Sequence, residues 1–180
     1  MADPVLVLLN GVPGSGKSTL ARAWTRRHDD PLAMALDVDV VRGMLGRWSD
    51  DALPAGRAAR AMAVAAIGVH LGAGHDVIVP QYLRRADFLD ELADAAHRAG
   101  ARFVECALVV DAAVAAERLR SRAAGSAVPG PEGRLEEPVA AVHEEFGRFL
   151  AGRPAAIVLR DPSVEELDGA VATARSASSG

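Results

Sequence analysis

The residues with the clearest chemistry form the segment GVPGSGKS, which matches the phosphate-binding pattern G-x-x-x-x-G-K-[ST]. Glycines let such a loop curl so that several backbone N–H groups point at one anion, and the helix that follows adds its positive dipole end. The lysine reaches the β- and γ-phosphates, and the hydroxyl after it can hold Mg²⁺. The segment therefore predicts binding of ATP with Mg²⁺, through Gly11, Gly14, Ser15, Gly16, Lys17, Ser18 and Thr19.

The choice of basic residues supports this interpretation. Lys17 is the only lysine in the sequence, and the other 19 of its 20 basic residues are arginine. A lysine is a compact point charge, whereas the wide planar guanidinium of arginine fits a tight phosphate loop poorly. The chain thus keeps lysine for the one position where the loop needs it.

A second group of polar residues, in the sequence LDVDVVR, follows an expected strand at 33–37. A carboxylate at the carboxyl end of a strand, facing the γ-phosphate, can accept the proton of an attacking hydroxyl. We predict Asp39 as this general base, with Asp37 orienting it or helping to hold Mg²⁺. Arg42, about one helical turn further on, can neutralise charge on the phosphoryl group or on an acidic substrate. The alternative is that Asp39 only caps the next helix.

The elements that must position these residues alternate along the chain. Strands are predicted at 4–10, 33–37, 76–79, 102–110 and 155–160, and helices at 17–28, 39–47, 55–72, 84–99, 111–122, 138–151 and 163–175. Alternation implies an α/β fold, a parallel sheet with helices on both faces and ligands at the carboxyl ends of the strands. We expect one domain over 1–175 and a disordered tail at 176–180.

These motifs resemble those of the P-loop small kinases, which include gluconate and shikimate kinases, chloramphenicol phosphotransferase, zeta toxins and the kinase domain of polynucleotide kinase. The resemblance covers most of the chain through element order, and Asp37-x-Asp39 is similar to the D-x-D of zeta toxins and gluconate kinases. Asp39-x-x-Arg42 is similar to the motif of polynucleotide kinases. The resemblance implies a three-layer P-loop fold with a five-stranded parallel sheet of order 2-3-1-4-5, and a helical lid.

The resemblance assigns the lid to roughly 117–137, whose helix reads ERLRSR. Arg118 and Arg122 are four residues apart and share one helix face, from which they can stabilise charge on the transferring phosphates; the alternative is a solvated basic face. Arg134 is a further lid candidate. Arg160, after the fifth strand, sits where related kinases contact adenine, although an ordinary turn explains it equally well.

One departure concerns the metal. Many P-loop enzymes carry an acidic Mg²⁺ anchor after the third strand, but the sequence there reads VPQY, without a carboxylate. Asp111, which follows four apolar residues, is one substitute, or it caps the next helix. If Asp111 does not bind the metal, Ser18 and the Asp37/Asp39 pair are expected to hold it. The loop after the third strand would then line the acceptor pocket with Gln81, Tyr82, Arg84 and Arg85.

Composition excludes several other classes of protein. The 180 residues are 50% hydrophobic and 24% charged with a net charge of -4, which excludes an intrinsically disordered chain. No apolar run reaches the ~20 residues of a membrane span, and no signal peptide is evident. One cysteine, Cys106, suits a reducing cytoplasm. The five histidines show no metal-ligand spacing. We expect a cytoplasmic protein with no membrane partner, and the oligomeric state stays open.

The sequence as a whole predicts an ATP-dependent phosphotransferase that moves the γ-phosphate to a hydroxyl of a small molecule, such as a sugar, a nucleoside-like compound or an antibiotic. The first alternative is a kinase of polynucleotide 5′-hydroxyls, against which stand the acidic pI of about 5.7 and an aromatic content of 4%. The second is an ATP-binding switch or ATPase without a phosphate acceptor. The acceptor, and the preference for ATP over GTP, are not determined.

Overall fold

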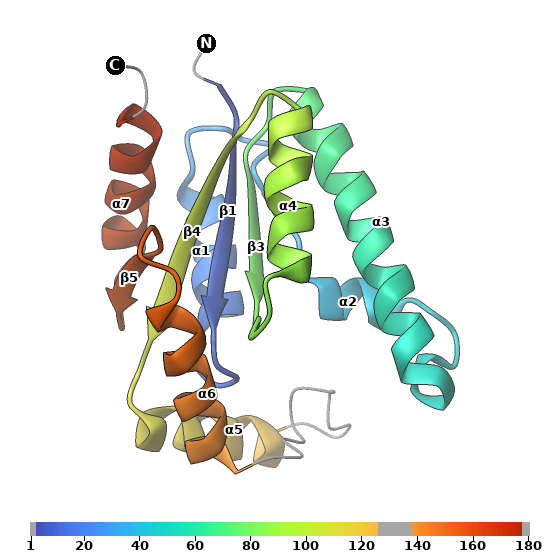
Figure 1. The fold of residues 1–180 in the computed structure, drawn as a ribbon, viewed down its shortest axis with the longest axis vertical. Coiled ribbons are helices and arrows are strands. Elements are labelled where there is room, and N and C mark those ends of the chain that lie inside the picture. The colour runs from blue at the N-terminus through green and yellow to red at the C-terminus, as the bar shows by residue number, and fades with distance from the viewer. Residues whose placement is uncertain (1–2, 126–137, 178–180) are drawn as a thin grey trace.

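Five parallel strands form one sheet in the order β2-β3-β1-β4-β5, as predicted (Figure 1). The structure, a computed structural model, describes residues 3–125 and 138–177, without the side chains of 122–125. The strands are β1 (Val5–Gly11), β2 (Met34–Ala35), β3 (Val77–Gln81), β4 (Arg102–Val109) and β5 (Ile157–Arg160). All seven residues of β1 are buried, because this strand is paired on both edges and covered on both faces.

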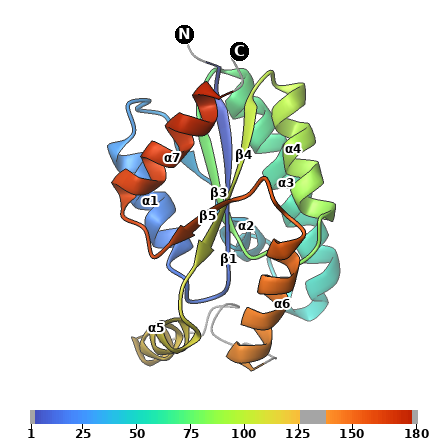
Figure 2. The ribbon, with the colours of Figure 1, turned by 60° about the vertical axis from the view of Figure 1, so that its left-hand side comes forward.

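Helices cover both faces of this sheet, as Figures 1 and 2 show from two sides. They are α1 (Lys17–Arg27), α2 (Val38–Gly43), α3 (Ala52–Gly72), α4 (Asp87–Arg98), α5 (Ala112–Gly125), α6 (Val139–Ala151) and α7 (Val164–Ser176), with a 3₁₀ turn, η1 (Trp48–Asp51), before α3. Alternate residues of β1 supply the two cores. Leu6 and Leu8 pack with α3 and α4, whereas Val5, Val7 and Leu9 pack with α1 and α7.

Some boundaries differ from the predicted ones. The second strand has two residues instead of five, because Asp37 already caps α2 three residues after Met34. The helix predicted at 39–47 ends at Gly43, and the chain passes through η1 into α3. α5 continues to Gly125, three residues beyond the predicted end at 122, and residues 126–137 of the predicted lid lie outside the described part. The predicted tail is also outside it from residue 178 onward.

One helical stretch among the described residues, Trp48–Gly72, is long and apolar enough to cross a membrane by length and composition. Helices that cover a sheet pass the same test, so this is weak evidence of a span. Its fully buried side chains, Ala59, Ala63, Ile67 and Leu71, recur every four residues and belong to the core that the sheet and α4 share. This spacing is typical of a helix with one face against a sheet.

The amino ends of the strands are held by a buried carboxylate. Asp76 accepts a hydrogen bond from the backbone N–H of Val5 at 2.7 Å and pairs with Arg175 and with His28, whose Nε2 lies at 3.3 Å. These contacts tie α1 and α7 to the sheet at the edge opposite the phosphate loop. No group of three or more metal-ligating side chains is present among the described residues.

Candidate active site

The phosphate loop joins β1 to α1, and its glycines are required by close packing. Gly14 and Gly16 have φ angles of +82° and +94°, in the region that favours glycine. A Cβ atom at Gly14 would lie 2.4 Å from the carbonyl oxygen of Ala115 on α5. A Cβ at Gly11 would lie 2.8 Å from Oγ of Ser15. A Cβ therefore does not fit at Gly14, which packs against α5, and at Gly11 it would crowd Ser15 and Leu108 of β4; at Gly16 it is the positive φ that favours glycine.

The loop has the properties of an anion site. α1 begins at Lys17 with no side-chain cap on its first N–H groups and no acidic residue in its first turn. The side chain of Ser15 is 2% exposed, and its Oγ finds no hydrogen-bond partner among the described residues. Lys17 is itself buried, at 5% exposure. A helix start without a side-chain cap, together with a buried cation, fits the phosphates of a nucleotide.

Asp37 links the phosphate loop to α2. Its Oδ2 accepts a hydrogen bond from Oγ of Ser18 at 3.1 Å, and its Oδ1 accepts one from the backbone N–H of Asp39 at 3.0 Å. Asp37 is thus the N-cap of α2, and the alternative in which Asp39 caps this helix is wrong. The hydroxyl and carboxylate oxygens of Ser18 and Asp37 are the ligand type that Mg²⁺ prefers, so this pair fits the metal assigned to it from the sequence.

Asp39 and Arg42 form an ion pair one turn apart on α2. The Nη2 of Arg42 lies 2.7 Å from Oδ1 of Asp39, and each side chain is about a quarter exposed, at 23% and 26%. The guanidinium also lies over the ring of Trp48, 4.9 Å from its centroid. The Nε of Arg42 is buried and has no hydrogen-bond partner in the part of the chain that the structure describes. The pair is therefore held in place, with one donor unused.

Arg118 reaches from α5 across the phosphate loop. Its Nη1 donates to the carbonyl oxygen of Ser15 at 3.2 Å, and its Nη2 pairs with Oδ1 of Asp161 at 3.0 Å. The two groups border a cleft of about 480 Å³ that also includes Gly14, Gly16 and residues 162–164. Of the predicted lid cations, Arg118 thus lies at the phosphate loop. The side chain of Arg122 and the whole of Arg134 are outside the described part.

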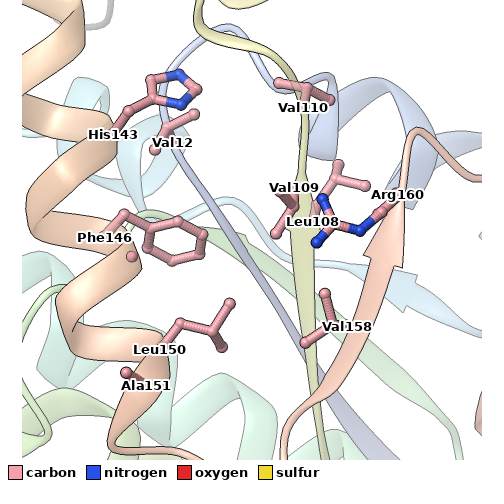
Figure 3. A pocket seen from close by; sticks show the side chains of 11 residues that line it. Val12, Leu108, Val109, Val110, His143, Phe146, Leu150, Ala151, Val158 and Arg160 are labelled. Atoms are coloured by element: carbon pink, nitrogen blue, oxygen red, sulfur yellow. The ribbon is translucent and has the colours of Figure 1, made fainter.

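The structure places Arg160 away from this cleft. Its side chain lines a second cavity, on the other face of the sheet, between α6 and strands β4 and β5 (Figure 3). The residues after it, Asp161, Pro162 and Ser163, line the cleft instead. Asp161 has a φ of +42°, and this left-handed turn redirects the chain at the end of β5. Arg160, for which a contact with adenine was expected, therefore lies outside the cleft, whereas the residues that directly follow it line the cleft.

The loop after β3, which carries the predicted acceptor residues, is fixed by contacts from distant parts of the chain. The side-chain amide of Asn10 accepts from the backbone N–H of Leu83 at 2.8 Å and donates to its carbonyl oxygen at 3.2 Å, with both groups buried. Arg84 pairs with Glu145 of α6 at 2.7 Å. Neither Asn10 nor Glu145 was predicted, and no local sequence signal marks either one.

The remaining predicted residues lie around this loop. Gln81 ends β3 beside Asn10 of β1, and Tyr82 lies with its ring centroid 6.2 Å from that of Phe146. Arg85 is exposed on the turn before α4. Asp111, the alternative metal anchor, is also exposed, and its charge acts on His143 of α6.

The fold resembles that of solved P-loop kinases. A kinase candidate from Chloroflexus aurantiacus j-10-fl is 17% identical, with a TM-score of 0.71 over 96% of each chain. A chain of the Pnkp1/Rnl/Hen1 RNA repair complex is 17% identical with a TM-score of 0.68; the match covers 86% of this chain and 48% of that one, so this chain spans about half its length. The APS kinase CysC of Mycobacterium tuberculosis, solved with AMPPNP and APS, is 20% identical with a TM-score of 0.60 over 97% and 98% of the chains.

These likenesses confirm the predicted α/β fold with its five-stranded parallel sheet. No curated protein matches the chain. The model of one family, described as AAA domain, matches residues 6–145, which include the phosphate loop, the Asp37–Arg42 segment and Arg118. The chain belongs to this AAA-domain family of P-loop proteins.

Proposed function

We propose that the chain is an ATP-dependent kinase that transfers the γ-phosphate to a hydroxyl group of a small molecule. The hydrogen bonds from Ser18 to Asp37 and from Asp39 to Asp37 carry this proposal. They join the loop that would hold the phosphates to the turn that carries a carboxylate suited to act as a base. A protein that only bound nucleotide would not require this second carboxylate beside the loop.

The phosphate loop would hold the nucleotide through the backbone of Gly11, Gly14, Ser15, Gly16 and Thr19. Lys17 would neutralise the β- and γ-phosphates, and Ser18 and Asp37 would hold Mg²⁺. When bound there, the metal would offset the negative charge of the phosphates. The cleft beside Arg118 and Asp161 supports a place for the nucleoside, because it opens directly from Gly14 and Gly16.

Asp39 would act as the general base. The acceptor hydroxyl oxygen forms a bond to the γ-phosphorus, the bond from that phosphorus to the β–γ bridging oxygen breaks, ADP leaves, and the hydroxyl proton passes to Asp39. The ion pair with Arg42 holds this carboxylate in one orientation. Arg42, Arg118 and Arg122 would neutralise charge that develops on the transferring group.

The acceptor would lie between α2 and the loop after β3, in contact with Asp37, Asp39 and Arg42 and with Gln81, Tyr82 and Arg85. The buried, unused Nε donor of Arg42 supports an acceptor that carries an electronegative or anionic group near its hydroxyl. We place this reaction in one domain over 1–175, in the cytoplasm, with a soluble acceptor and no membrane partner.

A second candidate is a kinase of polynucleotide 5′-hydroxyl ends. The ion pair of Asp39 with Arg42 and the likeness to the Pnkp1 complex favour it. A net charge of -4 and an aromatic content of 4% count against it, since single-stranded nucleic acids are bound by basic grooves and stacking rings. A third candidate is an ATPase or switch with no acceptor, which predicts slow hydrolysis that no hydroxyl compound stimulates.

The test is ADP release with Mg²⁺-ATP, alone and with sugars, nucleosides, antibiotics and 5′-hydroxyl oligonucleotides. Asp39→Asn should lower kcat for the stimulating acceptor by about 10²–10⁴-fold while ATP still binds, and Lys17→Ala should weaken ATP binding itself. Asp50→Asn is the matched control, because it removes an exposed carboxylate of the adjacent turn that pairs with Arg47. Stimulation that survives Asp39→Asn would refute the assignment of the base. Absence of stimulation by every acceptor would favour the switch.

A separate variant tests the acceptor pocket. Gln81→Ala removes a side chain at the end of β3 without touching the phosphate loop. We expect a higher KM for the acceptor and an unchanged KM for ATP. An unchanged acceptor KM would remove Gln81 from the pocket.

A further inference from the structure

A second cavity, on the face of the sheet opposite the nucleotide cleft, has no part in the proposed reaction. It has a volume of about 380 Å³, within the range of small-molecule sites, roughly 300–1,000 Å³. Figure 3 shows Phe146 and Leu150 of α6 on one side, facing Val109 of β4 and Val158 of β5 on the other. These walls are apolar, and they come from one helix and two strands.

Two nitrogen-bearing side chains line this apolar space. The Nε2 of His143 is buried and has no hydrogen-bond partner among the described residues. Burial lowers the pKa of His143, partly offset by the charge of Asp111, and so favours the neutral ring. The other is Arg160, whose side chain extends from β5 toward β4 in Figure 3. A buried ring nitrogen without a partner is costly, and a ligand atom that bonds to it would remove this cost.

The position of Arg160 follows from the alternation of side chains along β5. Ile157 and Leu159 pack in the core with α1 and α7, so Val158 and Arg160 face the other side of the sheet, toward α6. Val158 is 46% exposed although it is apolar. The strand thus presents an apolar side chain and a cation together at the cavity.

We propose that this cavity binds a small organic anion with a flat apolar body, of the aromatic carboxylate class. Its charged group would pair with Arg160, its rings would lie between Phe146 and Val158, and a polar substituent would bond to Nε2 of His143. An anion is favoured over a cation or a neutral compound because Arg160 is the charged group that lines the cavity among the described residues. Val12 of the phosphate loop also lines the cavity, so a bound ligand would contact the loop on the side away from the nucleotide.

The test is a titration of the full-length protein with 6-hydroxy-2-naphthoate, followed by amide and methyl NMR shifts. We expect saturable binding with a Kd of roughly 0.1 mM or tighter, and the largest shifts at Val12, Phe146, Leu150 and Val158. The neutral analogue 6-hydroxy-2-naphthamide should bind about tenfold more weakly, because it loses the charged contact. Equal affinity for acid and amide, or shifts confined to other surfaces, would overturn the proposal.

The affinities of protein variants for the same ligand provide a second test. Arg160→Gln should weaken binding of the naphthoate about tenfold, whereas Arg148→Gln, an exposed arginine of α6 that does not line the cavity, should leave the Kd within about twofold. His143→Phe keeps a ring in place, fills the same space and should weaken binding through the lost ring nitrogen. Unchanged affinity in both Arg160→Gln and His143→Phe would refute the site. Because binding is read without phosphate transfer, this result is independent of the proposed kinase activity.

Discussion

Replacing Gly14 by alanine tests whether α5 is packed directly on the phosphate loop. The backbone of Gly14 has a φ of +82°, and a residue with a Cβ in this left-handed conformation costs about 1–2 kcal/mol. The added methyl would also lie 2.4 Å from the carbonyl oxygen of Ala115 and 3.0 Å from Cγ of Leu119. Both neighbours are on α5, and the first is backbone, so the helix must move, at an overpacking cost of about 1–3 kcal/mol.

The two effects add to about 2–5 kcal/mol, a large part of the roughly 5–15 kcal/mol by which most domains are stable. The matched control is Gly68→Ala in the middle of α3, where an added Cβ meets no atom within 4 Å. Alanine there should stabilise the helix by up to about 1 kcal/mol.

The assay is urea unfolding followed by circular dichroism, with nucleotide binding measured on the folded fraction. We expect the unfolding midpoint to fall for Gly14→Ala and to stay or rise for Gly68→Ala. Displacement of α5 should also move Arg118 away from Ser15 and weaken nucleotide binding. If Gly14→Ala unfolds at the same urea concentration as the native protein, α5 does not pack on the phosphate loop. The arrangement of the cleft described above would then be wrong.

Three further predictions concern buried groups. Burial, with a smaller effect of the charge of Glu105, raises the pKa of the Cys106 thiol to about 12. Iodoacetamide should therefore label this single cysteine only as fast as the protein unfolds. Rapid labelling of the folded protein would contradict this prediction. Burial lowers the pKa of His143, so as the pH falls the unfolded chain binds this proton before the folded protein does. The free energy of unfolding should therefore fall as the pH drops below about 6.5. His143→Gln should flatten this part of the curve of stability against pH, and an unchanged slope would contradict the prediction. Asn10→Ala leaves the buried backbone N–H and C=O of Leu83 without a partner. It should lower the free energy of unfolding, measured in urea, by about 2–4 kcal/mol. A loss below about 0.5 kcal/mol would mean that water replaces both hydrogen bonds.

The sequence by itself determined the alternation of strands and helices and the location of the phosphate loop, whereas the strand order was expected from the resemblance to the P-loop small kinases. The alternation and the loop depend on local patterns: a continuous apolar run predicts a strand buried on both faces, and the spacing of Gly11, Gly16 and Lys17 defines a loop whose own backbone forms the site. The segment from Asp37 to Arg42 was also found locally, because its residues lie within one turn of each other. The structure then decided against the alternative weighed for Asp39, since Asp37 rather than Asp39 caps α2.

Only the tertiary structure decided which distant side chains meet at the carboxyl edge of the sheet. Asn10 and Leu83 are 73 residues apart and Arg118 and Asp161 are 43 apart, and no periodicity of the sequence connects either pair. Arg160 shows the reason most clearly. Side chains alternate between the two faces of β5, and the left-handed turn at Asp161 follows directly after its last residue, so one step along the chain separates a residue of the second cavity from a residue of the nucleotide cleft. Which face each one takes was fixed by the packing of Leu159 against α1 and α7.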